Sequence, residues 1–117
     1  MVNKYKIIEI LNVPKVATFT QGIKVAQVIE DDLLDNINIE MDFTDTKYHT
    51  SLFFNGIFDE LMRKGFDLKK FKDYTKLTGF AGGTIANMNK SLNNGIATQD
   101  NPEYKKSLDE HFEQEYE

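Results

Sequence analysis

The chain has 117 residues, 40% of them hydrophobic, a formal net charge of −5 and no cysteine. This length allows one domain with its own core and leaves no room for a second, and the lack of cysteine excludes disulfides, thiolate metal ligands and a catalytic cysteine. No run approaches the roughly 20 apolar residues of a membrane span, and Glu9 interrupts the segment that would have to form a signal-peptide core. We therefore expect a cytoplasmic protein with no membrane partner.

The first third of the chain predicts two strands and a helix. A run rich in β-branched residues ends at Pro14 and predicts a strand over about residues 3–11. Residues 16–19 predict a short second strand. Thr20 then offers the cap of a helix that continues to about Leu34, because apolar residues recur there at helical spacing.

Residues 36–65 contain both hydrophobic periods side by side. Every second residue from 37 to 43 is apolar, which predicts a strand with one buried face and one polar face. After a polar loop, an apolar stripe predicts a helix that begins at Thr50 or Ser51 and ends at Gly65. The residues of this stripe are Phe54, Ile57, Phe58, Leu61 and Met62.

The last third predicts a turn, a strand and two helices. Residues 68–77 fit a short helical turn followed by a strand, and the glycine-rich residues 79–83 lead into a helix that ends at residues 93–95. Asp100 or Asn101 can cap a final helix. Its apolar residues recur every four positions and would suit packing on the domain or a homodimer: Tyr104, Leu108, Phe112 and Tyr116.

Together these elements predict an α/β fold, with a sheet of about four strands, helices packed mainly on one face and an extra C-terminal helix. We place the domain at residues 1–97. Residues 98–117 form the acidic C-terminal helix, packed on the domain or on a partner, and carry seven acidic residues and two lysines, which account for the whole net charge.

The strand that ends in Asp42-Phe43-Thr44, with its loop, Thr50-Ser51 and a Phe-rich helix start, resembles the STAS-like family of small bacterial and phage proteins. This family is related to the anti-sigma-factor antagonists, and the resemblance covers residues 16–97. In those antagonists the loop reads Asp-Ser-Ser-Gly, and a partner kinase that also sequesters a sigma factor phosphorylates a serine there. The corresponding residues here begin at Thr50 and lack the acid and the glycine, but a hydroxyl remains at Ser51.

The resemblance implies a STAS-like layer and a kinase-like, ATP-binding partner protein. A phosphate at a helix N-terminus would face unpaired N–H groups and the positive end of the helix dipole, although a hydroxyl there also serves as a plain cap worth about 1 kcal/mol. We therefore predict a non-enzymatic regulatory domain that binds a protein through residues 44–56. The predicted regulatory and partner-binding residues are Asp45, His49, Thr50, Ser51, Phe54 and Asn55.

An alternative is an inhibitor from a phage or mobile element, of the anti-defence or anti-CRISPR type, which blocks a nucleic-acid-binding enzyme such as a defence nuclease. Its acidic surface would include the C-terminal helix and the residues Glu30, Asp31, Asp32 and Asp35. Direct binding of nucleic acid is disfavoured by the negative net charge.

Catalytic signatures are weak in this sequence, so we expect no enzyme, no metal and no cofactor. His49 and His111 do not have metal-ligand spacing, and residues 79–84, GFAGGT, lack the lysine of a phosphate-binding loop. A third hypothesis, a small hydrolytic enzyme, would require a cleft that joins His49 to an acid and to Ser51, but no G-x-S-x-G element accompanies them.

Overall fold

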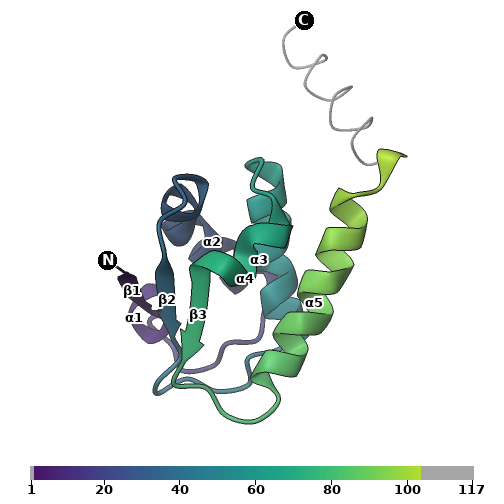
Figure 1. The fold of residues 1–117 in the computed structure, drawn as a ribbon. Coiled ribbons are helices and arrows are strands. Elements are labelled where there is room, and N and C mark those ends of the chain that lie inside the picture. Colours follow the sequence, from purple (N-terminus) through teal and green to yellow (C-terminus); the bar gives the residue numbers. More distant parts are fainter. Residues whose placement is uncertain (1, 104–117) are drawn as a thin grey trace, which may run out of the picture.

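Three parallel strands form the sheet in the computed structural model, which describes residues 2–103 (Figure 1). The strands are β1 (Asn3–Lys6), β2 (Ile39–Asp42) and β3 (Thr75–Thr78), and they lie in the order β1-β2-β3. In the register of the sheet, Lys4 of β1 lies beside Glu40 of β2, which lies beside Lys76 of β3. The predicted α/β class with helices packed on a sheet is confirmed, but the prediction of about four strands is wrong, because the described chain forms three.

Within residues 2–103, five helices and one 3-10 turn complete the fold. They are α1 (Ile7–Leu11), α2 (Phe19–Leu34), α3 (Ser51–Arg63), η1 (Leu68–Lys70), α4 (Phe71–Tyr74) and α5 (Thr84–Gln99). Helices α2 and α3 lie side by side behind the sheet, and α5 packs on α3 on the side away from α2 (Figure 1). Within residues 2–103, no helix combines the length and the apolar character that a membrane crossing demands.

The strand predicted over residues 3–11 ends early and is followed by a helix. Strand β1 ends at Lys6, and α1 begins at Ile7 because Ile7 and Leu11, one helical turn apart, are both buried. The left-handed backbone of Asn12 (φ 59°) then ends the helix. The apolar run over residues 3–11 therefore belongs to two elements, and the single long strand is wrong.

The predicted second strand over residues 16–19 is also wrong. Residues 16–18 form no strand and Phe19 already begins α2, while the one isolated bridge nearby, between Lys15 and Lys47, precedes the segment. Thr18 is the N-cap of α2, not Thr20, because its hydroxyl accepts the N–H of Gln21 while the Gln21 side chain accepts the N–H of Thr18. Residues 18–21 therefore form the capping box at the start of α2 and not the end of a strand.

The later elements follow the sequence more closely. Thr50 caps α3, Gly65 has the positive φ (85°) expected at a helix end, and the turn and strand over residues 68–77 are present. Helix α5 does not end at residues 93–95 and instead continues to Gln99, through the predicted domain boundary at residue 97. Gly95 serves packing, since a Cβ there would lie 2.8 Å from Leu68 Cδ1. Most of the predicted C-terminal helix lies outside the described residues.

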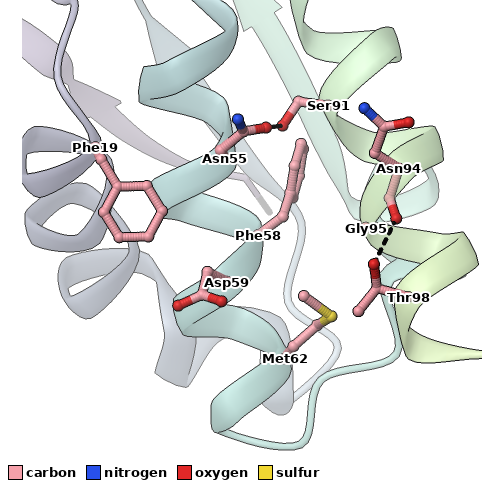
Figure 2. A pocket seen from close by; sticks show the side chains of 9 residues that line it. All are labelled: Phe19, Asn55, Phe58, Asp59, Met62, Ser91, Asn94, Gly95 and Thr98. Atoms are coloured by element: carbon pink, nitrogen blue, oxygen red, sulfur yellow. Dashed lines mark hydrogen bonds between the residues drawn. The ribbon is translucent and has the colours of Figure 1, made fainter. Parts of the chain in front are cut away.

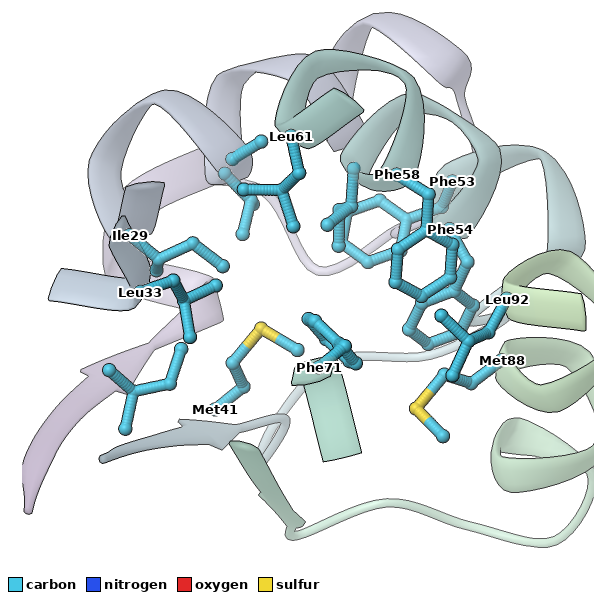
Figure 3. Close-up of a cluster of buried hydrophobic side chains, with 14 of the residues drawn as sticks. Ile29, Leu33, Met41, Phe53, Phe54, Phe58, Leu61, Phe71, Met88 and Leu92 are labelled. Carbon is cyan, nitrogen blue, oxygen red and sulfur yellow. The ribbon is translucent and has the colours of Figure 1, made fainter. Parts of the chain in front are cut away.

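An aromatic core fills the space between the sheet and the helices (Figure 3). Phe58 of α3 meets Phe71 of α4 edge to face, with ring centroids 4.9 Å apart, and Phe53 meets Phe54 in the same manner at 5.2 Å. Met41 of β2 reaches this core from the sheet. The opposite face of the sheet is polar: Lys4 Nζ lies 3.7 Å from Glu40 and 3.5 Å from Asp42.

Helices α2 and α3 touch backbone to backbone at two glycines. A Cβ on Gly22 would lie 2.0 Å from the carbonyl oxygen of Phe53, and a Cβ on Gly56 would lie 2.1 Å from that of Phe19. Side chains cannot fit in this space, so the two glycines set the distance between the helices.

We expect Gly56→Ala to lower the free energy of unfolding by about 1–3 kcal/mol or more, because the added methyl meets backbone that cannot move independently. Alanine is the better helix former, by about 1 kcal/mol, so without the crossing the substitution would stabilise. Gly82→Ala is the control, since a Cβ there meets nothing within 4 Å. Urea denaturation of the three proteins measures the difference, and a Gly56→Ala protein as stable as wild type would contradict the crossing.

Candidate functional site

The loop between β2 and α3 has an unusual backbone. Asp45 (φ 64°), Tyr48 (φ 80°) and His49 (φ 23°) all lie in the left-handed region, which non-glycine residues rarely adopt. Such conformations persist only where surrounding contacts impose them. The bonds that hold this loop therefore define the site.

His49 is the internal anchor of the loop. Its side chain is buried, with 3% of its surface exposed, and its ring lies 4.7 Å from the ring of Phe43. Nε2 lies 2.6 Å from Thr46 Oγ1, and Nδ1 lies 2.7 Å from Thr84 Oγ1. The ring thereby joins the loop to the first turn of α5.

The hydrogen-bond pattern assigns the tautomer of His49. Thr46 Oγ1 donates its only proton to the carbonyl oxygen of Phe43, at 2.5 Å, so it must accept a proton from His49 Nε2–H. In the neutral ring Nδ1 then accepts the hydroxyl proton of Thr84. Burial lowers the pKa of His49 and keeps the ring neutral.

This arrangement leaves His49 no free nitrogen with which to act on Ser51. Both ring nitrogens are occupied by threonine hydroxyls, and the nucleophile-and-base geometry that the enzyme hypothesis requires is not formed here. A further bond from Asn87 Nδ2 to the carbonyl oxygen of His49, at 3.0 Å, makes the residue a structural joint between the loop and α5.

The glycine-rich loop before α5 also supports this region. A Cβ on Gly79 (φ 68°) would lie 2.4 Å from Thr44 Oγ1 and 2.6 Å from Asp42 Oδ1. Asp42 Oδ1 accepts both the hydroxyl and the N–H of Thr44, at 2.6 and 2.9 Å, and these bonds lower the pKa of Asp42. The glycine at residue 79 is therefore explained by close packing on the end of β2.

Thr50 and Ser51 have different roles. Thr50 Oγ1 accepts the N–H of Phe53, at 3.2 Å, and donates to the carbonyl oxygen of Ala17, at 2.6 Å, so the Thr50 hydroxyl is fully engaged. Ser51 is the first residue of α3, is half-buried and makes no side-chain hydrogen bond within residues 2–103. Of the two candidate switch residues, Ser51 has the available hydroxyl.

The remaining predicted residues divide by exposure. Asp45 and Asn55 are exposed, and Asn55 Oδ1 accepts a hydrogen bond from the hydroxyl of Ser91 on α5. Phe54 is fully buried in the core. Phe54 and His49 therefore support the site from inside and offer no surface for direct contact with a partner.

Two exposed apolar residues were missed by the sequence analysis. Tyr48 and Leu52 are 60% and 53% exposed, and in the sequence they lie before and after Ser51. Leu52 gave a signal, because it lies on the helical face of Asn55 and Asp59, opposite the apolar stripe. The exposure of Tyr48 could not be predicted, since a loop has no hydrophobic periodicity from which exposure can be inferred.

A groove of about 280 Å³ runs between α3 and α5, next to this surface (Figure 2). Asn55 and Ser91 lie at one end of it, and Phe58 lies between the two helices. Phe19, at the start of α2, borders the groove and is 36% exposed.

The alternative acidic surface is smaller than its sequence suggested. Asp32 accepts hydrogen bonds from Asn3 Nδ2 (2.8 Å) and from the Tyr5 hydroxyl (2.5 Å). Burial and this bond raise the pKa of Tyr5 to about 12. Asp31 and Asp35 remain exposed at the end of α2.

Glu30, the fourth predicted acid, faces α3 and is mostly buried. Its side chain is 12% exposed, and Oε1 lies 3.9 Å from Lys64 Nζ. Burial raises the pKa of Glu30, Lys64 opposes that shift, and the nearby Glu60 adds to it. Oε2 of both glutamates is buried without a hydrogen-bond partner, whereas Glu60 Oε1 accepts from Arg63.

Comparison with protein-family models, with curated proteins and with solved structures finds no match to this chain. The STAS-like resemblance therefore stays a prediction. Within residues 2–103, no three histidine or acidic side chains are grouped so that they could hold a metal ion.

The buried His49 predicts that stability falls as the pH drops below neutral. The pKa of His49 is lower in the folded chain than in the unfolded chain, where it is about 6.5. The unfolded state therefore binds the proton first, and the free energy of unfolding falls as the pH decreases through that value. Urea denaturation between pH 7 and pH 5 measures this slope. His49→Gln should be less stable at pH 7 and should lose this part of the slope, whereas an identical slope in both proteins would contradict the assignment.

Glu30→Gln should stabilise the protein at pH 7 by roughly 1 kcal/mol, because Oε2 is buried without a hydrogen-bond partner and the burial of the charge outweighs its attraction to Lys64. The raised pKa means that the folded chain favours the protonated form of Glu30. The stability that protonation contributes is fully present below the unfolded pKa and is lost as the pH rises through the folded pKa. The gain should therefore shrink toward pH 4. Asp31→Asn, exposed on the same helix, is the control and should change little. A Glu30→Gln protein less stable than wild type at pH 7 would contradict this.

Proposed function

We propose that this chain is a non-enzymatic regulatory domain that binds another protein through residues 44–56. The observation that carries the proposal is a pair of exposed apolar side chains, Tyr48 and Leu52, which precede and follow Ser51 in the sequence. Tyr48 lies in the loop and Leu52 in the first turn of α3, and the bonds of His49 and Thr50 fix the backbone between them from inside. Exposed apolar residues on a rigid loop suit protein recognition, because little freedom is lost on binding.

Ser51 is the proposed switch of this surface. A phosphate on its hydroxyl would lie at the first turn of α3, close to unpaired N–H groups and the positive end of the helix dipole. The added charge would also sit next to Leu52, where it would oppose an apolar contact. Thr50 is less suited, since modification would break its bonds to Phe53 and Ala17.

By resemblance, the proposed fold is a STAS-like layer and the proposed partner is a kinase-like, ATP-binding protein. Two features of the described chain support this proposal. The first is the succession of a strand, a loop and a helix whose first residue, Ser51, carries the hydroxyl. The second is that this strand belongs to a parallel sheet. No catalytic arrangement is needed for this role, because the chain acts by being bound.

The alternative, an acidic inhibitor of a nucleic-acid-binding enzyme, has less support. Asp32 and Glu30 point inward and are bound to other side chains, so Asp31 and Asp35 alone remain of the four predicted acids. Such an inhibitor would bind with strong salt dependence, whereas the apolar surface around Ser51 would not.

Capture of partners by the tagged protein from its native host, with and without ATP, tests the proposal. Leu52→Glu and Ser51→Asp should each weaken capture at least about tenfold, a cost near 1.4 kcal/mol, while Thr50→Ser, which keeps the capping hydroxyl, should bind like wild type. Mass spectrometry should identify an ATP-binding protein and phosphate on Ser51. Capture that survives Leu52→Glu but is abolished by salt or by Asp31→Asn with Asp35→Asn would contradict the proposal and favour the inhibitor.

A further inference from the structure

Two charge-free stretches of the sequence meet at one end of the domain. Residues 48–58 and residues 77–89 contain no lysine, arginine, aspartate or glutamate, although 28% of the chain is charged. The first stretch ends the loop after β2 and enters α3, and the second ends β3, forms the glycine-rich loop and enters α5. The loops that follow β2 and β3 lie at the same end of the molecule (Figure 1).

Hydrogen bonds join the two stretches. Nδ1 of His49 lies 2.7 Å from Thr84 Oγ1, and the side chain of Asn87 donates to the carbonyl oxygen of His49 at 3.0 Å. Where the strands end, the N–H of Phe43 donates to the carbonyl oxygen of Thr78 at 2.8 Å. The loop after β2 and the start of α5 are therefore held together and form one surface.

Each stretch exposes two large apolar side chains. Tyr48 and Leu52 are 60% and 53% exposed, and Phe80 and Ile85 are 39% and 37% exposed. Leu52 and Ile85 lie in the first turns of α3 and α5. We call these four side chains the two-loop surface.

The two-loop surface has the composition of the centre of a protein interface. Charged residues are depleted there and aromatic residues are enriched, and the largest apolar patch on a monomer is often functional. An exposed apolar residue elsewhere has a different setting: Leu34 is 42% exposed but lies between Asp32 and Asp35 in the sequence. The absence of charge is therefore a property of this end of the domain.

The size of the two-loop surface favours one kind of occupant. A wholly buried aromatic side chain accounts for about 150–250 Å², so at their exposed fractions the four side chains offer on the order of 400 Å². A stable interface buries about 800 Å² of each partner, and permanent homodimers bury more. The surface thus suits a transient complex with another protein more than it suits a permanent dimer of this chain.

We propose that the two-loop surface binds an uncharged, apolar surface of a partner protein in a transient complex. This inference rests on the proposed function and extends it, because the partner contacts the start of α5 as well as residues 44–56. A charged group on the partner would be buried without a counter-charge and would weaken binding. Ser51 lies within the first charge-free stretch, so a phosphate there would add charge where the complex has none to pair with it.

Peptides selected from a random phage-displayed library on the immobilised full chain are the probe for this inference. The selected peptides should have an apolar, uncharged centre. Each should shift the amide signals of Tyr48, Leu52, Phe80 and Ile85 in the 15N-labelled protein. Their affinity should be nearly equal at about 0.1 M and 0.5 M salt, because no ion pair contributes.

Three variants test which residues the peptides contact. Ile85→Asp should weaken binding at least about tenfold, and it should fold, because an acidic residue in the first turn of α5 is favoured by the helix dipole. Leu52→Glu should weaken binding to a similar extent. Leu34→Glu places the same charge on a comparably exposed leucine at the end of α2 and should bind like wild type.

The other outcomes each overturn the inference. Loss of binding with Leu52→Glu but not with Ile85→Asp would leave the proposed function intact, whereas binding that survives both variants would contradict both proposals. Acidic peptides that salt releases, or a library that yields no binder, would exclude an apolar partner surface. A micromolar dimer that Ile85→Asp dissociates would assign the surface to a second copy, and binding to phosphatidylcholine vesicles that Ile85→Asp abolishes would assign it to a membrane.

Discussion

The backbone contact between α2 and α3 at Gly22 and Gly56 is the constraint on which the site depends. It brings the carbonyl oxygens of Phe19 and Phe53 within reach of the opposite helix and leaves no room for side chains. The start of α2 is thereby held beside the start of α3, and the Thr50 hydroxyl can reach the carbonyl oxygen of Ala17. The position of Ser51 follows from this crossing, because Ser51 is the next residue.

A second support reaches the same helix end from the other side. His49, neutral and buried, joins the loop to Thr84, and Asn87 binds its carbonyl oxygen. Left-handed backbone at three loop residues is maintained by these contacts. The exposed side chains of Tyr48, in the loop, and Leu52, in the first turn of α3, thus stand on backbone that Thr50 bonds to Ala17, just before α2, and that His49 bonds to Thr84 of α5. This is the preorganised arrangement that favours protein recognition.

Local patterns in the sequence were sufficient for much of the fold. The alternation over residues 37–43, the stripe of α3 and the caps at Thr50 and Gly65 are features of single elements. The strand is present but shorter, over Ile39–Asp42, and the stripe, the Thr50 cap and the positive φ of Gly65 are present. The error at residues 3–11 arose because β-branched residues serve both a strand and a short buried helix. Helix α5 was cut short because Gly95 signals a helix end locally, whereas its role is tertiary packing on Leu68.

The candidate site was less predictable, for a physical reason. The sequence placed His49 and Phe54 among the partner-binding residues, Phe54 also in the apolar stripe, whereas both are buried. Their burial depends on elements that are distant in the chain. Thr84 is 35 residues from His49, and no periodicity connects them. Tyr48 was missed because its exposure follows from a loop conformation that only these distant bonds impose.

The proposed function requires that the loop over residues 44–50 is a rigid, preformed surface. Backbone 15N relaxation of the loop tests this most directly. We predict order parameters near 0.85 at Tyr48 and His49, equal to those of α3, as expected for rigid backbone. Values below about 0.6 would show a flexible loop and would contradict the account.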